Sequence, residues 1–275
     1  MIQSLKQGNF IPYAFEEAFF ENSSISPINI KLDNKNVKLI GKIDRYDILK
    51  KKDINYLKVI DYKSSKKDID LNMIYNGIGT QLFIYMNALI SKDKEKFKPA
   101  ALLYDDFSFN KVKFDTFKEF SNLDENLFNE KIIDNNKPLG FVIKDLDLIE
   151  NLDTTLGNDK QKSLILPITL KNKGLEISNR TKGLSEDEFE IVNKFILKNT
   201  KKILKSIYSG DISLKPYKYD ENTACKYCEY KSICKFDEKC NKYKIIKKIA
   251  KNNNLEDILE KMNKDLNEKE GYEKW

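Results

Sequence analysis

The chain contains no histidine among its 275 residues. This absence excludes His-based acid–base catalysis and any His-ligated zinc site, and it leaves Asp, Glu, Lys, Tyr and Cys for chemistry. Arginine is nearly absent as well, since only Arg45 and Arg180 accompany the many lysines. Arg45 directly follows Asp44. Two interpretations of Arg45 stay open, namely contact with a phosphate group and pairing with a neighbouring acid.

Long apolar runs and known targeting patterns are also missing. No apolar run approaches the length of about 18 residues that crosses a membrane, and the N-terminus lacks a signal pattern, so we expect a cytoplasmic protein without a membrane partner. The pattern Gly-x-x-x-x-Gly-Lys-Ser/Thr does not occur either, so ATP hydrolysis must come from elsewhere. The net charge of +6, from 49 basic and 43 acidic residues, permits a polyanionic partner without requiring one.

Residues 38–63 carry the clearest local pattern, which reads KLIGKIDRYDILKKKDINYLKVIDYK. The runs Lys38–Leu49 and Tyr56–Lys63 flank the polar cluster Lys50–Asn55. Apolar residues recur in each run with a period of two, which is typical of half-buried strands. A hairpin is therefore predicted, and both of its strands carry acids.

The predicted hairpin gathers charged side chains. Side chains two apart on a strand share a face, so Asp61 and Lys63 project together, and strand pairing could bring Asp44 beside Asp61. Two carboxylates with a lysine suit Mg²⁺ and phosphodiester chemistry, because Mg²⁺ prefers carboxylates, water and substrate phosphate. A bound metal lowers the pKa of water, and Lys63 would orient or deprotonate that water. The alternative is a surface Asp-x-Lys pair, which is common in a chain with 33% charged residues.

Several short motifs follow one another along the chain. They are GKIDR at 41–45, VIDYKS at 59–64, YNG at 75–77 and QLFIY at 81–85. In order and spacing they resemble the nuclease motifs of the RecB-like branch of the PD-(D/E)xK superfamily, and most nearly the C-terminal nuclease domains of the AddB family, from about Phe10 to Tyr243. The resemblance implies an α/β fold with a restriction-endonuclease-like mixed sheet flanked by helices, followed by a cysteine-ligated iron–sulfur segment.

The resemblance also implies roles for individual residues. Asp44, Asp61 and the carbonyl of Tyr62 would bind Mg²⁺ or Mn²⁺, and Lys63 would serve the attacking water. Glu16 stands in the acidic position of a Glu-x-x-Phe stretch and could complete the metal site. A surface glutamate is the alternative for Glu16.

Further residues are candidates for contact with DNA. Gln81 and Tyr85 match the RecB-like Gln-x-x-x-Tyr motif and would flank the DNA strand, although two residues four apart on a helix are often simply packed. Lys66 and Lys67 lie in the polar turn Ser64–Asp70, close to where a DNA backbone would run, and they either touch phosphate or are solvated. Arg45 is the third candidate for a phosphate contact.

Four cysteines occur late in the chain, and none precedes Cys225. Cys225, Cys228 and Cys234 form a C-x2-C-x5-C arrangement, and Cys240 follows. Two thiolates spaced C-x2-C can converge on one metal, and a cytoplasmic setting disfavours disulfides. The resemblance implies a [4Fe–4S] cluster whose fourth ligand lies far upstream of the nuclease motifs. Either this chain is a fragment without that ligand or Cys240 replaces it; Zn²⁺ on the four thiolates and inert thiols are the remaining interpretations.

The remaining pattern predicts a succession of elements. A helix is expected over Leu71–Ser91 and a strand over Lys98–Lys113, of which Ala100–Tyr104 is apolar enough to be central. Irregular structure is expected from Phe114 to Asp159, a strand over Ser163–Leu170 and a turn at Asn172–Gly174. A helix from a capping box at Ser185 to near Gly210 and a helical tail over Lys242–Trp275 complete the succession. The expected division is a nuclease core at 1–215 with an irregular insertion around 114–160, a cysteine segment at 216–243 and a charged tail at 244–275.

These patterns favour metal-dependent hydrolysis of DNA phosphodiester bonds. The resemblance implies an exonuclease that cuts the 5′-ended strand of linear duplex as an AddA-like helicase partner feeds it, in double-strand-break repair and recombination. A free-standing RecB-like or CRISPR-associated exonuclease is one alternative. A metal-stabilised DNA-binding scaffold without catalysis is another.

Overall fold

The computed structural model describes residues 5–33, 35–107, 124–157, 159–246, 248–249 and 254–268. The chain divides into two compact units. The first unit holds the residues up to Ile30, Val37–Ile69 and Gln81–Glu190, and the second holds Lys31–Asn36, Asp70–Thr80 and the residues from Ile191 onward. All candidate site residues outside the cysteine segment therefore belong to the first unit.

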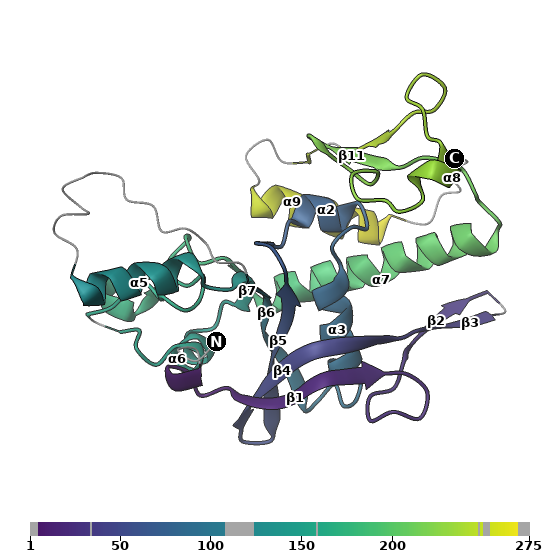
Figure 1. Cartoon of the computed structure of the whole chain (residues 1–275). Helices are drawn as coiled ribbons and strands as arrows, with labels where there is room; N and C mark the ends of the chain where they lie inside the picture. Colours follow the sequence, from purple (N-terminus) through teal and green to yellow (C-terminus); the bar gives the residue numbers. More distant parts are fainter. Residues whose placement is uncertain are drawn as a thin grey trace. The chain divides into compact units, whose positions relative to one another are not determined.

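A six-stranded sheet forms the centre of the first unit (Figure 1). Its order is β1 (Ile11–Phe19), β4 (Gly41–Lys51), β5 (Ile54–Lys63), β6 (Phe97–Asp106), β7 (Leu139–Ile143) and β10 (Gly183–Leu184). The pairs β5–β6 and β7–β10 are parallel, and the other neighbours are antiparallel. The expected mixed α/β sheet is confirmed, and the acid-bearing strands β4 and β5 lie inside it rather than at its edge.

Helix α3 (Gln81–Ile90) packs on β5 and β6 in the first unit. Its buried residues are Leu82, Phe83, Tyr85, Met86, Ala88 and Leu89. Phe83 stacks on Phe189 with ring centroids 5.6 Å apart. The unit also contains α5 (Glu125–Asn135), α6 (Leu146–Leu152), the paired strands β8 (Leu170–Lys171) and β9 (Glu176–Ile177) with the 3₁₀ turn Asn172–Gly174, and the start of α7 (Glu186–Tyr208). Burying the apolar face of α3 fixes that helix over the centre of the sheet.

The second unit packs its helices around an aromatic pair. Tyr75 of α2 (Leu71–Tyr75) stacks on Phe195 of α7 with centroids 5.0 Å apart, and its hydroxyl donates to Asp265 of α9 (Leu255–Asn267) at 2.5 Å. The apolar stripe expected in the tail is buried at Ile258, Leu259 and Met262. The unit also contains β11 (Tyr217–Tyr219), β12 (Asn222–Thr223), β13 (Lys244–Ile245) and α8 (Lys231–Cys234). Its stretch Lys31–Asn36 comes from the two-stranded sheet of β2 (Ile28–Leu32) and β3 (Lys35–Leu39).

The helix expected over 71–91 is two helices instead of one. Helix α2 ends at Tyr75 and α3 begins at Gln81. Gly77 and Gly79 between them have φ angles of +83° and +75°. A right-handed helix cannot pass through such left-handed backbone, and glycine adopts it without a steric penalty. The apolar period of the sequence continues across this break, which is why it conceals the two helices.

Other expected boundaries also differ. The hairpin turn is Lys52-Asp53 alone, so most of the polar cluster 50–55 belongs to the strands, and Lys38 and Leu39 belong to β3. The expected strand over 163–170 is wrong apart from its last residue, because Ser163 binds the backbone N–H groups of Ile165 and Leu166 in a turn. The region around 124–157 contains α5, β7 and α6 rather than irregular structure, while residues 108–123 lie outside the described chain.

The capping box at the start of α7 is confirmed. The backbone N–H of Ser185 donates to the Glu188 carboxylate at 2.7 Å, and the Glu188 N–H donates to the Ser185 hydroxyl at 3.1 Å. Both groups are among the helix N-terminal donors that would otherwise have no partner. The reciprocal pair therefore fixes where the helix begins.

Candidate active site

The register of β4 and β5 brings Asp44 and Asp61 to neighbouring positions. Arg45 pairs with Ile60, so one further step along the ladder sets Asp44 opposite Asp61. The backbone N–H of Tyr62 donates to a carboxylate oxygen of Asp44 at 2.9 Å. Asp61 is only 1% exposed. The two carboxylates predicted to share a site do lie together at the end of the hairpin.

A chain of polar contacts continues from Asp61 into helix α3. Lys63 forms an ion pair with Asp61, and its ammonium donates to Gln81 Oε1 at 3.1 Å. Gln81 Nε2 then donates to the Tyr85 hydroxyl at 2.7 Å. Gln81 and Tyr85 lie one helical turn apart on the same face, which allows both to reach the strand. The structure thus brings Asp44 close to this group of four contacting residues, which are Asp61, Lys63, Gln81 and Tyr85.

The buried position of Asp61 changes its ionisation. Burial raises the pKa of Asp61, and the neighbouring Asp44 adds to the rise, whereas the ammonium groups of Lys63 and Lys67 oppose it. Asp61 Oδ2 is fully buried, and the Lys63 ammonium faces it as an ion pair. A buried carboxylate is normally paired with a cation, and Lys63 has this role for Asp61.

Gly41 explains why α3 can lie so close to the hairpin. A Cβ at Gly41 would stand 2.7 Å from the ring of Phe19 and 3.6 Å from that of Tyr85. Phe19 and Tyr85 pack edge to face with centroids 6.0 Å apart. Only glycine leaves room for this approach, and the packing holds the Tyr85 ring beside the carboxylates.

The opposite face of the same strands contains a buried group of charges. The Arg45 guanidinium donates two hydrogen bonds to Asp47, at 2.6 and 2.8 Å, and a third to the Tyr62 hydroxyl at 3.3 Å. Lys58 also contacts Asp47 at 2.8 Å. Arg45 is 1% exposed, so the interpretation of Arg45 as a DNA-phosphate contact gives way to its alternative, pairing with an acid.

Glu16 does not join the two aspartates. The strand β1 is irregular here, since Glu16 has a φ angle of +53°, and its exposed carboxylate forms an ion pair with Lys42. Within the described ranges no three His, Cys, Asp or Glu side chains lie close enough to hold a metal ion. In this geometry the Glu16 carboxylate is paired with Lys42, which itself interacts with Asp44 and Tyr85, and the role of Glu16 in metal binding stays a prediction.

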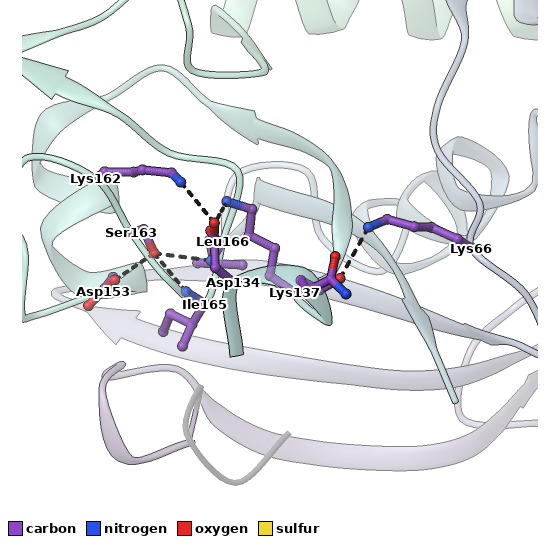
Figure 2. Close-up of polar contacts among 9 residues, drawn as sticks. Lys66, Asp134, Lys137, Asp153, Lys162, Ser163, Ile165 and Leu166 are labelled. Carbon is purple, nitrogen blue, oxygen red and sulfur yellow. Dashed lines mark hydrogen bonds and ion pairs between the residues drawn. The ribbon is translucent and has the colours of Figure 1, made fainter. Parts of the chain in front are cut away.

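The two lysines of the turn after β5 differ in their surroundings. Lys66 donates to the backbone carbonyl of Asn135 in α5 at 3.1 Å, as Figure 2 shows, beside the separate cluster in which Asp134 accepts from Lys137 and Lys162. Lys67 instead lies over the ring of Tyr104, 4.7 Å from its centroid. Of the two, only Lys67 is among the charged groups that act on Asp61.

Comparison with known proteins shows which superfamily contains this chain. Residues 2–235 match the PD-(D/E)XK nuclease superfamily. The chain belongs to this superfamily. It is 39% identical over 239 residues to an ATP-dependent helicase/deoxyribonuclease subunit (AddB) of Caldanaerobacter subterraneus, which covers 86% of this chain and 20% of the relative. The subunit of the same name from Clostridioides difficile is 33% identical over 272 residues, which covers 96% and 23%. The chain therefore spans about a fifth of the length of these relatives.

The name of the PD-(D/E)XK superfamily describes an acid, any residue and a lysine, which are Asp61, Tyr62 and Lys63 here. Asp44 and Asp61 supply hard oxygen donors of the type that Mg²⁺ and Mn²⁺ accept. The nearby carboxylate of Asp44 adds a second negative charge beside Asp61, which such an ion would balance. We conclude that the donor set of this PD-(D/E)XK site fits a divalent metal, with two carboxylates rather than three.

Sequence reasoning missed Tyr104, a further member of the PD-(D/E)XK site. Tyr104 of β6 pairs with Asp61 in parallel register and is 3% exposed. The sequence shows it only as one residue of an apolar central strand. A strand–helix–strand succession implies parallel pairing of β5 with β6. That rule, applied to the acid strand, could have found its neighbour.

The cysteine segment shows no comparable arrangement. Cys225 and Cys228 are half-buried, Cys234 and Cys240 are exposed, and all four are free thiols. Cys234 ends the four-residue helix α8, and Cys240 lies beyond the residues matched to the PD-(D/E)XK superfamily. The donor set of four thiols suits an iron–sulfur cluster or Zn²⁺, but no three of them converge in the part of the chain that the structure describes.

Among the described helices of this PD-(D/E)XK protein, none has both the length and the apolar content needed to span a membrane.

Proposed function

We propose that this chain is a metal-dependent deoxyribonuclease that hydrolyses DNA phosphodiester bonds. The observation that carries the proposal is the contact path from Asp61 through Lys63 to Gln81 and Tyr85, beside which Asp44 accepts a hydrogen bond from the backbone N–H of Tyr62. Two carboxylates and a lysine that lie together in a largely buried site favour hydrolysis of a phosphodiester over simple binding of DNA. Burying charged groups is unfavourable, and DNA binding alone does not require it.

Each side chain has a role in the proposed reaction. Asp44 and Asp61, with the Tyr62 carbonyl, would hold Mg²⁺ or Mn²⁺, which supplies an acidified water and positive charge at the phosphate. Lys63 would orient or deprotonate the attacking water, and the bond from Lys63 to Gln81 would fix the direction of its ammonium. The Tyr85 hydroxyl, held by Gln81, would flank the DNA strand.

The wider role is a proposal from the names of the relatives. Those names describe a helicase/deoxyribonuclease subunit, of which this chain spans about a fifth. We infer an exonuclease that acts within an AddAB-type complex, with an AddA-like helicase partner, in cytoplasmic repair and recombination of double-strand breaks. A free-standing RecB-like or CRISPR-associated exonuclease remains the second candidate, because the matched residues by themselves contain the whole predicted site.

The cysteine segment is proposed to hold a [4Fe–4S] cluster, with Zn²⁺ as the alternative. Four thiols within residues 225–240 support this proposal, since thiolates are the ligands of both. Such a group would hold the segment together rather than take part in hydrolysis.

Degradation of linear and closed-circular DNA with Mg²⁺ or Mn²⁺ tests the proposed function. The unmodified chain is compared with Lys63→Ala and with the control Lys50→Ala, which removes an exposed lysine from the same hairpin. We expect loss of linear DNA only, in the unmodified chain and in Lys50→Ala. Cleavage that is unchanged in Lys63→Ala would contradict the assigned site. DNA binding without any cleavage, with an AddA-like partner present, would favour the scaffold.

A further inference from the structure

The hydroxyl of Tyr104 is buried and has no hydrogen-bond partner among the described residues. The side chain is 3% exposed, and within the described chain its oxygen makes no hydrogen bond. Asp61 and Tyr85 are the polar groups that act on the phenol electrostatically, so the hydroxyl lies within the candidate site rather than behind it. A buried donor normally has an acceptor, and leaving it unpaired is unfavourable. The missing acceptor points to a group that arrives with a ligand.

Two ammonium groups lie over the ring of the same tyrosine. Lys67 Nζ is 4.7 Å and Lys63 Nζ is 5.6 Å from the ring centroid. An aromatic face attracts a cation, so the ring holds both side chains near the site. The two like charges repel each other, and Lys63 already has Asp61 and Gln81 as partners. An anion beside Lys67 would relieve this repulsion.

We propose that Lys67 binds a phosphate of the DNA strand next to the one that is cleaved, and that Tyr104 positions it. The ring of Tyr104 holds the Lys67 ammonium, and its hydroxyl donates to an oxygen of the same phosphate. This assignment rests on the proposed function, because it takes DNA as the substrate. It adds Tyr104 of strand β6 to the expected site residues and specifies which phosphate Lys67, in the turn after β5, would contact.

The other lysine of the turn provides the comparison. Lys66 and Lys67 are adjacent and both are exposed, but the ammonium of Lys66 binds the carbonyl of Asn135. Replacing either lysine by alanine changes the net charge equally. A general electrostatic effect would therefore be the same in both variants, whereas a specific phosphate contact at Lys67 would not.

The experiment measures kcat and KM for linear DNA over a range of salt concentrations. For Lys67→Ala we expect KM to rise roughly tenfold with a smaller change in kcat, and the slope of log(kcat/KM) against log[salt] to become shallower by about 0.7 to 0.9, the value for one lost phosphate contact. Lys66→Ala should change the slope less, and Lys67→Arg should restore it. Equal slopes for Lys66→Ala and Lys67→Ala would overturn the assignment.

Tyr104→Phe separates the ring from the hydroxyl. The variant keeps the ring and its attraction for Lys67, so the salt slope should stay as in the unmodified chain, while KM rises several-fold. An unchanged KM would overturn the role of the hydroxyl. Binding of the same labelled DNA is measured in parallel for every variant. If no protein cleaves DNA, the proposed function fails, and the binding slopes still decide whether Lys67 contacts phosphate.

Discussion

The carboxylate site and the cysteine segment are equally clear as sequence patterns, but they differ in how the fold positions them. Asp44 and Asp61 lie on the eleven-residue strand β4 and the ten-residue strand β5, whose ladder runs from the Arg45–Ile60 pair to the Lys51–Ile54 pair. The cysteines lie among strands of two or three residues and a helix of four. The first site is fixed by the ladder of two long strands, and the second is held by the backbone hydrogen bonds of turns and short strands.

This difference teaches which sites a fold can build without a ligand. The register of a long ladder keeps each side chain beside the same cross-strand neighbour. A slip of one residue is unfavourable because it would turn every side chain to the other face of the sheet. Short elements bury little apolar surface and supply few such constraints, so a bound metal or cluster contributes folding free energy in segments of this kind. Substitutions in the hairpin and in the cysteine segment should therefore differ in how strongly their effects depend on a bound ligand.

The largest expected effect concerns Asp61. Asp61→Asn removes one of two carboxylates from the site, and we expect cleavage to fall by at least about 10³-fold, since the metal contributes several kcal/mol to such reactions. Mn²⁺ should raise the Tm of the unmodified chain, because it binds the folded state, and it should not raise the Tm of Asp61→Asn. The control is Asp53→Asn in the hairpin turn, which should keep both. Retention of cleavage in Asp61→Asn would contradict the assigned role.

The same variant has an opposite effect on the metal-free fold. Burial raises the pKa of Asp61, so the folded state favours the protonated carboxyl. The stability that this group contributes is therefore present at acidic pH and is lost as the pH rises from the ordinary pKa through the raised one. Asp61→Asn stays neutral, so in EDTA its stability should fall less than that of the unmodified chain as the pH rises above the ordinary aspartate pKa of about 4. Urea unfolding at several pH values measures this, and a larger fall in the variant would contradict it.

Asp47 tests whether the buried charges hold the hairpin together. Asp47→Ala would leave Arg45 and Lys58 buried beside each other without their shared acid. Breaking a buried ion pair in this way costs about 3–5 kcal/mol, so a lower urea midpoint is expected, with a loss of cleavage that follows unfolding. Asp53→Ala is again the exposed control. A change below about 1 kcal/mol, the usual value of a surface pair, would show that the group does not hold the hairpin.

The sequence predicts the hairpin and the capping box of α7 because each depends on local period or spacing, whereas the mixed sheet is what the family resemblance implies. It predicts the grouping of Asp44, Asp61 and Lys63 for the same reason, since strand alternation and hairpin pairing decide it. It cannot decide what Arg45 binds, because both a phosphate and Asp47 satisfy a guanidinium. The break at Gly77 is concealed because the apolar period continues across it. The position of Tyr104 does not follow from local period but from the parallel pairing of β5 with β6, which the strand–helix–strand succession implies.

The cysteine segment tests the other side of the contrast. Reconstitution with iron and sulfide, or with Zn²⁺ alone, should protect residues 216–246 from proteolysis, and at a ligand concentration 100 times Kd the stabilisation is about 2.7 kcal/mol. Cys228→Ser should abolish this protection, because C-x2-C supplies two adjacent ligands. Visible charge-transfer absorption distinguishes the cluster from Zn²⁺. If Cys240→Ser behaves as the unmodified chain, Cys240 is not the fourth ligand.

The smallest expected effect concerns Gly41, which connects the rigid hairpin to the residues of α3. A methyl group at this position would stand 2.7 Å from the Phe19 ring, so Gly41→Ala must displace that ring and, through their edge-to-face contact, Tyr85. Overpacking of this kind costs about 1–3 kcal/mol. Gly157→Ala is the matched control, because a Cβ there meets no atom within 4 Å. We expect Gly41→Ala to lower the urea midpoint and, in the fraction that stays folded, to lower kcat, since the hydrogen bond from Gln81 to Tyr85 shifts with the ring. A lower midpoint with unchanged kcat would show that Tyr85 only packs, and that the hairpin alone positions the reacting groups.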